Sequence, residues 1–342
     1  MRATTRFARA VACLTVPATA QRGLRSAAGA HLAAGRRAMG GPVSGAGGTF
    51  WGAVGANIGV KAPALIAPHQ DLSMTYAELL GQATSFAGVL SRDLGYARGD
   101  KLAVVLGGNC AESVIVQLGA GFAGVTVVTA KDPADEKLVG CRGLVVSDHV
   151  LIAAQHPEGI LAGEKHPPIL CHDDTGVGSA CANLFFQAVV DARAIGTPER
   201  DGESVHAIYN GAKPVSQANI VAIAQEAAMS LALKQSDRVC IPVPLAHPFG
   251  FGGALSVLMA GGTLVLPAST DPSLLVQTIE EEACSVFFAD THMIKKAIEL
   301  DLKIDPLFNV RGVVKIGGGN AFGLGTPVEW SGMMLSTAGT PA

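Results

Sequence analysis

Three short segments of the sequence contain residue types that bind or transform small molecules. A short loop contains one glycine and one lysine, and backbone amides with an ammonium group are what phosphate sites use. A second segment carries a histidine between two prolines, and a third is a glycine turn that follows an apolar stretch. The residues that we single out in these segments are Gly211, Lys213, His247, Gly317, Gly318 and Gly319.

Other site chemistries lack support in the sequence. Cys171–Asp174 reads Cys-His-Asp-Asp, but a metal site needs further ligands, and no second cluster stands at a suitable spacing. None of the seven cysteines forms a CxxC pair, and no G-x-S-x-G nucleophile elbow occurs. The glycines of Gly317–Gly323 lack the spacing of a dinucleotide site, so a tight turn describes them better. We predict no metal ligand, no cofactor and no hydrolytic nucleophile.

Composition places the chain among globular α/β proteins. Of its 342 residues 49% are hydrophobic, 15% are charged and 42 are glycine, which excludes a disordered chain, a coiled coil and a small disulfide scaffold. The net charge of −3 gives no indication of nucleic-acid binding, and we predict none. The charge is divided unevenly, with +8 over residues 1–70 and −11 over residues 71–342.

The first 39 residues resemble a mitochondrial targeting segment. They are rich in Arg, Ala, Ser and Thr and contain no acidic residue, and the alternative is a basic tail with no targeting role. We expect residues 1–39 to direct the chain to the mitochondrial matrix or the matrix face of the inner membrane. Residues 40–70 are then a flexible linker and lead-in, and residues 71–342 the folded domain. No apolar run is long enough for a membrane span, so any membrane association would be peripheral and through a complex.

From Asp71 onward, helical periodicity alternates with short apolar runs, which favours a mostly parallel sheet covered by helices. The clearest helix runs over Thr75–Leu94, with Thr75 and Glu78 at the spacing of a capping box. Further helices are predicted over 111–123, 219–233, 253–260, 272–283 and 291–300. Strands are predicted over 101–106, 125–129, 143–147, 206–209, 239–243, 263–266, 286–288 and 310–316.

Four segments in this order resemble the N-terminal domain of the adenylate-forming acyl-CoA synthetase superfamily. The resemblance covers about Leu72 to Gly319, is weak in the middle, and rests on four anchors. The anchors read MTYAELLGQATSFAGVL with GYARGDKLAVVL, VPLAHPFGF with LMAGGTLVL, DPSLLVQTIEEEACSVFFADTHMI, and VRGVVKIGGGN. The implied fold is layered α/β, with mostly parallel sheets sandwiched by helices and without the C-terminal lid domain.

The resemblance also implies a reaction, in which ATP activates a carboxylate to an acyl-adenylate with release of pyrophosphate. That reaction needs a phosphate loop, a carboxylate for Mg²⁺ and a lid that closes over the site. Here the aligned loop, from Tyr209 to Asn219, lacks about seven residues of the family's Thr/Ser/Gly run. His247 falls on a family position that lines the acyl and phosphate sites, although it also suits a helix start or simple packing. No acidic residue follows Glu329, and no lid segment is recognisable.

These departures predict a protein that is not an enzyme. We expect a catalytically inactive acyl-CoA synthetase-like protein that serves as a structural or accessory subunit of a mitochondrial assembly, with other subunits as its partners. The sequence does not distinguish a respiratory complex, ATP synthase or the mitochondrial ribosome. The alternative is a residual acyl-, CoA- or AMP-binding protein or a weak adenylate-forming ligase.

Overall fold

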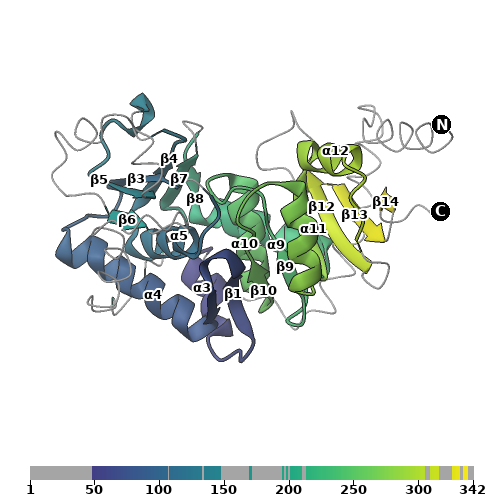
Figure 1. The fold of residues 1–342 in the computed structure, drawn as a ribbon. Coiled ribbons are helices and arrows are strands. Elements are labelled where there is room, and N and C mark those ends of the chain that lie inside the picture. Colours follow the sequence, from purple (N-terminus) through teal and green to yellow (C-terminus); the bar gives the residue numbers. More distant parts are fainter. Residues whose placement is uncertain are drawn as a thin grey trace, which may run out of the picture.

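The computed structural model describes residues 48–106, 108–132, 135–147, 169–171, 195, 198, 201–209, 213–304, 309–315, 326–331 and 334–337. These residues form two β-sheets with helices packed between and around them (Figure 1). Among them, no helix combines the length and the apolar character that crossing a membrane requires.

The larger sheet has eight strands, and its centre is parallel. Neighbouring strands follow the order β14-β13-β12-β11-β9-β10-β1-β2, and only β2, β13 and β14, at its two ends, run antiparallel to their neighbours. The bounds are β1 Pro63–Ala67, β2 Leu72–Thr75, β9 Arg238–Cys240, β10 Thr263–Val265, β11 Val286–Asp290, β12 Asn309–Lys315, β13 Thr326–Ser331 and β14 Met334–Thr337.

The smaller sheet has six strands in the order β6-β5-β3-β4-β7-β8, and all of them except the edge strand β8 are parallel. Parallel neighbours place their carboxyl ends at one edge, so Thr129 of β4 and Tyr209 of β7 are register partners there. The bounds are β3 Lys101–Val105, β4 Thr126–Thr129, β5 Gly143–Ser147, β6 Ile169–Cys171, β7 Val205–Tyr209 and β8 Val215–Ser216.

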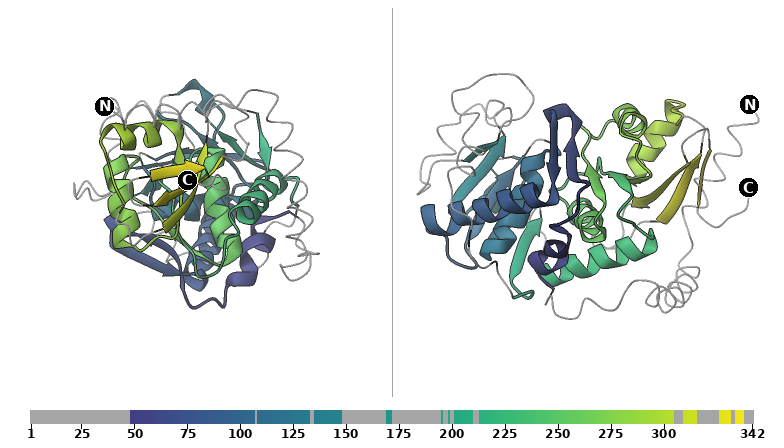
Figure 2. Two further views of the ribbon diagram at one scale, coloured as in Figure 1. Left: turned by 90° about the vertical axis from the view of Figure 1, so that its right-hand side faces the viewer. Right: turned by 90° about the horizontal axis from the view of Figure 1, so that it is seen from below.

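Helices cover both faces of the larger sheet and fill the space between the two sheets. In the right-hand view of Figure 2, α9 and α10 lie on one side of the larger sheet and α11 and α12 on the other. The helices are α3 Phe50–Val54, α4 Tyr76–Gly88, α5 Ala111–Ala123, α9 Gln217–Ser230, α10 Pro248–Ala260, α11 Pro272–Glu281 and α12 Thr291–Glu299. Short 3₁₀ turns lie at Gly55–Asn57, Pro68–Gln70 and Glu136–Leu138, and a π-helical turn at Val89–Asp93.

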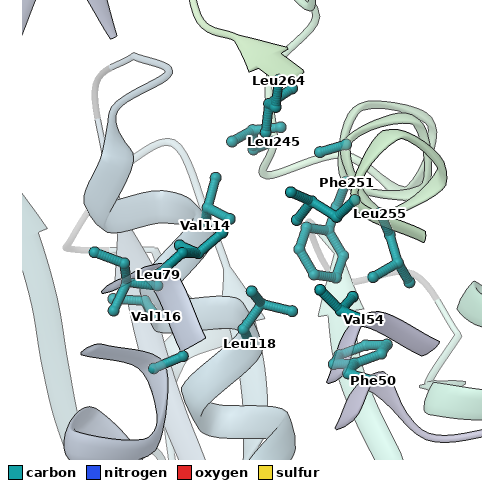
Figure 3. Close-up of a cluster of buried hydrophobic side chains, with 14 of the residues drawn as sticks. Phe50, Val54, Leu79, Val114, Val116, Leu118, Leu245, Phe251, Leu255 and Leu264 are labelled. Carbon is teal, nitrogen blue, oxygen red and sulfur yellow. The ribbon is translucent and has the colours of Figure 1, made fainter. Parts of the chain in front are cut away.

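Alternation along the strands divides the apolar residues between two cores. In β11, Val286 and Phe288 face the core shared with α10, whereas Phe287 and Ala289 pack against α11 and α12. The first core continues across to α4 and α5, which pack against each other, and α5 also contacts β4 of the smaller sheet. Figure 3 shows its centre, where side chains of α5 and of α10 meet from opposite sides. One continuous core therefore joins the two sheets.

The predicted fold class is confirmed, and most predicted elements are present with boundaries shifted by a few residues. The capping box of α4 is complete, because the Thr75 hydroxyl accepts the Glu78 N–H and the Glu78 carboxylate accepts the Thr75 N–H. Asp271 caps α11 as predicted, and Asp290 caps α12 in the same way.

Three predicted segments differ more strongly from the structure. Residues 50–70 are not a flexible linker, because α3 and β1 lie in the core and Phe50 has no exposed surface. The predicted strand over 239–243 ends at Cys240, and α10 begins at Pro248 rather than at residue 253. Pro242 and Pro244 have no N–H for a sheet ladder, and the glycines after Pro248 concealed the helix start. The predicted targeting segment, residues 1–39, lies outside the described residues.

His206 of β7 joins α3 and α10 through aromatic contacts. Its ring meets Phe50 edge-on at 4.4 Å between centroids and stacks on Phe251 at 5.4 Å. Among the described residues neither ring nitrogen has a hydrogen-bond partner, and only 1% of the residue is exposed. Burial lowers the pKa of His206 from 6.5 to about 3, so the ring is neutral in the folded protein.

This burial predicts a pH-dependent stability. The unfolded chain binds a proton at His206 below pH 6.5 and the folded chain does not, so stability falls as pH drops below 6.5. At pH 5 the expected loss from this residue is about 2 kcal/mol relative to pH 7.5. Chemical denaturation at the two pH values measures it. The variant His206→Leu should lose this part of the pH dependence, and an unchanged pH dependence would contradict the interpretation.

Candidate functional site

The segment that contains His247 leaves the larger sheet at the end of β9 and leads to α10. Residues 241–247 read Ile-Pro-Val-Pro-Leu-Ala-His, and the two prolines prevent the segment from continuing a sheet ladder. Most of the segment is buried, so its carbonyl groups need partners other than water. Side chains from α5, from the residue pair before it and from β4 provide these partners.

Asn109 is the first of these side chains and lies just before α5. Its amide nitrogen donates to the carbonyl oxygens of Ile241 and Val243, both at 2.9 Å, and its Oδ1 accepts the Leu245 N–H at 2.9 Å. Asn109 is 5% exposed. Because all three bonds are buried, losing the side chain would leave backbone groups unsatisfied, at about 1–3 kcal/mol each.

Gln117 and Thr129 hold the next two carbonyl groups. The Gln117 amide, from the middle of α5, donates to Leu245 O at 2.9 Å, and the Thr129 hydroxyl donates to Ala246 O at 3.2 Å. Gln117 also accepts the Tyr209 hydroxyl at 3.1 Å. Burial raises the pKa of Tyr209 well above its usual value, so this hydroxyl keeps its proton and donates. The carboxyl ends of β4 and β7 are thereby connected to the segment that contains His247.

His247 is the N-cap of α10. Its Nδ1 accepts the Phe249 N–H at 3.1 Å, and the helix continues with Pro248 at its first position. A neutral imidazole that accepts at Nδ1 carries its proton on Nε2, so Nε2 is a donor. The helix-start role left open by the sequence is therefore confirmed, and the ring is half-buried.

The structure places two of the six residues singled out from the sequence. His247 lies beside the carboxyl ends of β4 and β7, and Lys213 lies, exposed, two residues before β8. Tyr209, four residues before Lys213 in the chain, donates its hydroxyl to Gln117, and Gln117 donates to the segment that contains His247. The residues that lie outside the described residues are Gly211, Gly317, Gly318 and Gly319.

Asn109, Gln117 and Thr129 were not recognised as site residues from the sequence. A usable signal exists for Gln117, because it is a polar residue in the middle of an apolar helix, where burial demands hydrogen-bond partners. Asn109 and Thr129 lie next to a loop and at a strand end, where polar residues are common, so their roles depend on tertiary structure.

Metal and thiol chemistry find no support in the described part of the chain. It contains no group of three His, Cys, Asp or Glu side chains arranged to hold a metal ion. Burial raises the pKa values of the Cys110 and Cys240 thiols, so both remain protonated at neutral pH.

Comparison with known proteins identifies the family. The model of the AMP-binding enzyme family matches residues 55–151 and 213–332, which is more than half of the chain. The chain belongs to this family. Lys213 and His247 fall in the second matched segment, and Gly211 falls between the two segments.

Individual relatives agree with this assignment. Over 82 residues, 22% of this chain, the sequence is 34% identical to a Bacillus subtilis (strain 168) protein named as an acyl-CoA synthetase, YngI, of which the match spans only 15%. The inhibitor-bound N-terminal domain of FACL13 from Mycobacterium tuberculosis superimposes with a TM-score of 0.64 and 18% identity, covering 79% of this chain and 70% of that one.

Two further solved structures show the same fold. A Rhodopseudomonas palustris CGA009 protein named as a long-chain fatty-acid CoA ligase gives a TM-score of 0.66 at 18% identity, covering 82% of this chain and 78% of that one. A benzoate CoA ligase from Burkholderia xenovorans LB400 gives 0.64 at 17% identity, covering 82% and 64%. The resemblance recognised in the sequence is confirmed.

The comparisons also correct one expectation. The shortened loop and the unmatched carboxyl-terminal parts led us to predict a protein that is not an enzyme. The matched family is a family of enzymes, and the structural relatives include CoA ligases. The prediction that the chain is not an enzyme is therefore wrong by this comparison. A sequence departure in one loop does not establish that a fold built for this chemistry has lost it.

Gly250 in the first turn of α10 offers a test of how tightly the site segment is packed. A Cβ at this position would lie 2.2 Å from the Pro244 carbonyl oxygen, and backbone cannot move aside as a side chain does. We expect Gly250→Ala to lower the free energy of unfolding by about 2–3 kcal/mol. Gly81→Ala in α4, where nothing lies within 4 Å, should raise it by about 0.5–1 kcal/mol. Urea denaturation of both variants measures this, and equal effects would contradict the close approach.

Proposed function

We propose that this chain binds an adenylate, AMP or an acyl-adenylate, at the site formed by the loop of Lys213 and the segment of His247. The observation that carries the proposal is the hydrogen-bonded connection of these two segments through Gln117 in a chain of the AMP-binding enzyme family. Ligands of open α/β folds bind at the carboxyl ends of parallel strands, and both segments lie at such ends.

The donors of this site suit an anionic ligand. Lys213 supplies an exposed ammonium group for a phosphate, and the Nε2–H of His247 donates to a phosphate or carboxylate oxygen. Buried Asn109, Gln117 and Thr129 fix the backbone before His247, so the imidazole does not have to be ordered when the ligand binds. We assign no described residue to a metal ion.

Weak adenylate formation is the activity that this site would support. In that reaction a carboxylate oxygen forms a bond to the α-phosphorus of ATP while diphosphate leaves. ATP supplies the adenylyl group, and the residues of this chain bind and orient the two anions. The relatives named above are ligases of fatty and of aromatic acids according to their names, so the proposal specifies a carboxylic acid without choosing between these two types.

Ligand-dependent thermal stability tests the proposal. We expect AMP and a non-hydrolysable acyl-adenylate analogue to raise the melting temperature of the full chain, because a ligand at 100 times its Kd stabilises by about 2.7 kcal/mol. His247→Asn keeps a good helix cap but removes the imidazole, and Lys213→Ala removes the ammonium. Both variants should weaken adenylate binding at least five-fold, which isothermal titration calorimetry measures.

Lys61→Ala is the matched control for Lys213→Ala. Lys61 is also exposed, but it lies before β1, at the amino end of a strand rather than at a carboxyl end. Lys61→Ala should bind as the wild type does. Absence of stabilisation by AMP, ATP and acyl-adenylate analogues in the wild type would overturn the proposal. Carboxylate-dependent exchange of pyrophosphate into ATP then measures whether binding is accompanied by weak ligase activity.

We also propose that residues 1–39 direct the chain to the mitochondrial matrix, on the basis of their arginines and their lack of acidic residues. A fluorescent protein fused to residues 1–39 should enter mitochondria, and replacing its arginines by glutamine should leave it outside. A cytosolic wild-type fusion would contradict the proposal. Association with other subunits of a mitochondrial assembly remains a prediction, which the native size of the endogenous protein tests.

A further inference from the structure

The carbonyl groups of the two residues directly before His247 accept hydrogen bonds from side chains of α5 and of β4. Leu245 O accepts from Gln117 of α5, and Ala246 O accepts from Thr129 of β4. Each donor side chain is 2% exposed, so water is not at hand to replace either bond. We infer that Gln117 and Thr129 are positioning residues, which set where the His247 imidazole stands relative to an adenylate. This inference rests on the proposed function.

Gln117 also makes a hydrogen bond to the strand that precedes Lys213 in the chain. Tyr209 ends β7, four residues before Lys213 in the chain, and its hydroxyl donates to the Gln117 oxygen. The Gln117 nitrogen donates in turn to the carbonyl two residues before His247. One side-chain amide thus bonds both to the carboxyl end of β7 and to the segment that contains His247. Thr129, the register partner of Tyr209, adds a second fixed point next to the imidazole.

Strand β4 contains a residue that separates a positioning role of Thr129 from a purely structural one. Thr126 lies on the same strand, is 3% exposed, and also donates its hydroxyl to a backbone carbonyl, that of Val205 at 2.9 Å. Thr126 and Thr129 therefore have similar burial and make the same type of bond. Only the bond from Thr129 reaches the segment that contains His247, so replacing each by valine changes the site in one case alone.

The experiment measures AMP affinity on folded protein, well below the melting temperature, by calorimetry. Thr129→Val should weaken binding about five-fold, the equivalent of one buried hydrogen bond. Thr129→Ser restores the hydroxyl and should bind within two-fold of wild type. Thr126→Val should also stay within two-fold, although it loses a comparable bond. Equal affinities of Thr129→Val and Thr126→Val would overturn the inference.

Gln117→Met removes both hydrogen bonds of the central amide, and we expect at least a ten-fold loss of affinity. If this variant does not fold, Tyr209→Phe removes only the bond to the Gln117 oxygen and should weaken binding by about three- to five-fold. Unchanged affinity in Tyr209→Phe would contradict the part of the inference that links Lys213 to His247 through Gln117.

A second measurement requires no ligand. The imidazole Cε1–H resonance of His247, assigned by its loss in His247→Asn, reports the surroundings of the ring. It should shift in Thr129→Val and stay in place in Thr126→Val. A shift without any adenylate binding by the wild type would refute the proposed function and support the positioning. An unchanged resonance in both variants would refute the positioning itself.

Discussion

The structure depends on satisfying the backbone of residues 241–247. This segment has two prolines, belongs to no sheet and lies mostly buried between two sheets. Asn109 before α5, Gln117 of α5 and Thr129 of β4 make five hydrogen bonds to it, four to carbonyls and one from the Leu245 N–H. Because buried polar backbone without partners is costly, the two sheets are fixed relative to each other by polar bonds as well as by their shared apolar core.

The same constraint explains why the site forms where it does. His247 ends the restrained segment and caps α10, so its ring is held from both directions along the chain. Gly250 allows the first turn of α10 to approach the Pro244 carbonyl, which a larger residue would prevent. The resulting arrangement places His247 next to Ala246, whose carbonyl accepts from Thr129 at the carboxyl end of β4, which is where we propose that an adenylate binds.

The features that could be predicted from the sequence are those that a local residue pattern determines. The capping box at Thr75 and Glu78 and the alternating apolar strands are local features, and the layered fold follows from their order. The hydrogen bonds of Asn109 and Thr129 join residues more than a hundred positions apart, which no local pattern reports. The same limit explains why residues 50–70 were wrongly predicted as a linker, since Phe50 packs against His206 and Phe251, which are distant in sequence.

Hydrogen exchange at the Leu245 amide tests the central constraint most directly, because this N–H donates to Asn109 Oδ1 in the buried junction. The account predicts that the amide exchanges slowly, through rare opening of the structure, and that Asn109→Ala accelerates exchange at Leu245 far more than at strand amides of β3. Fast exchange at Leu245 in the wild type, or equal rates in wild type and variant, would contradict it.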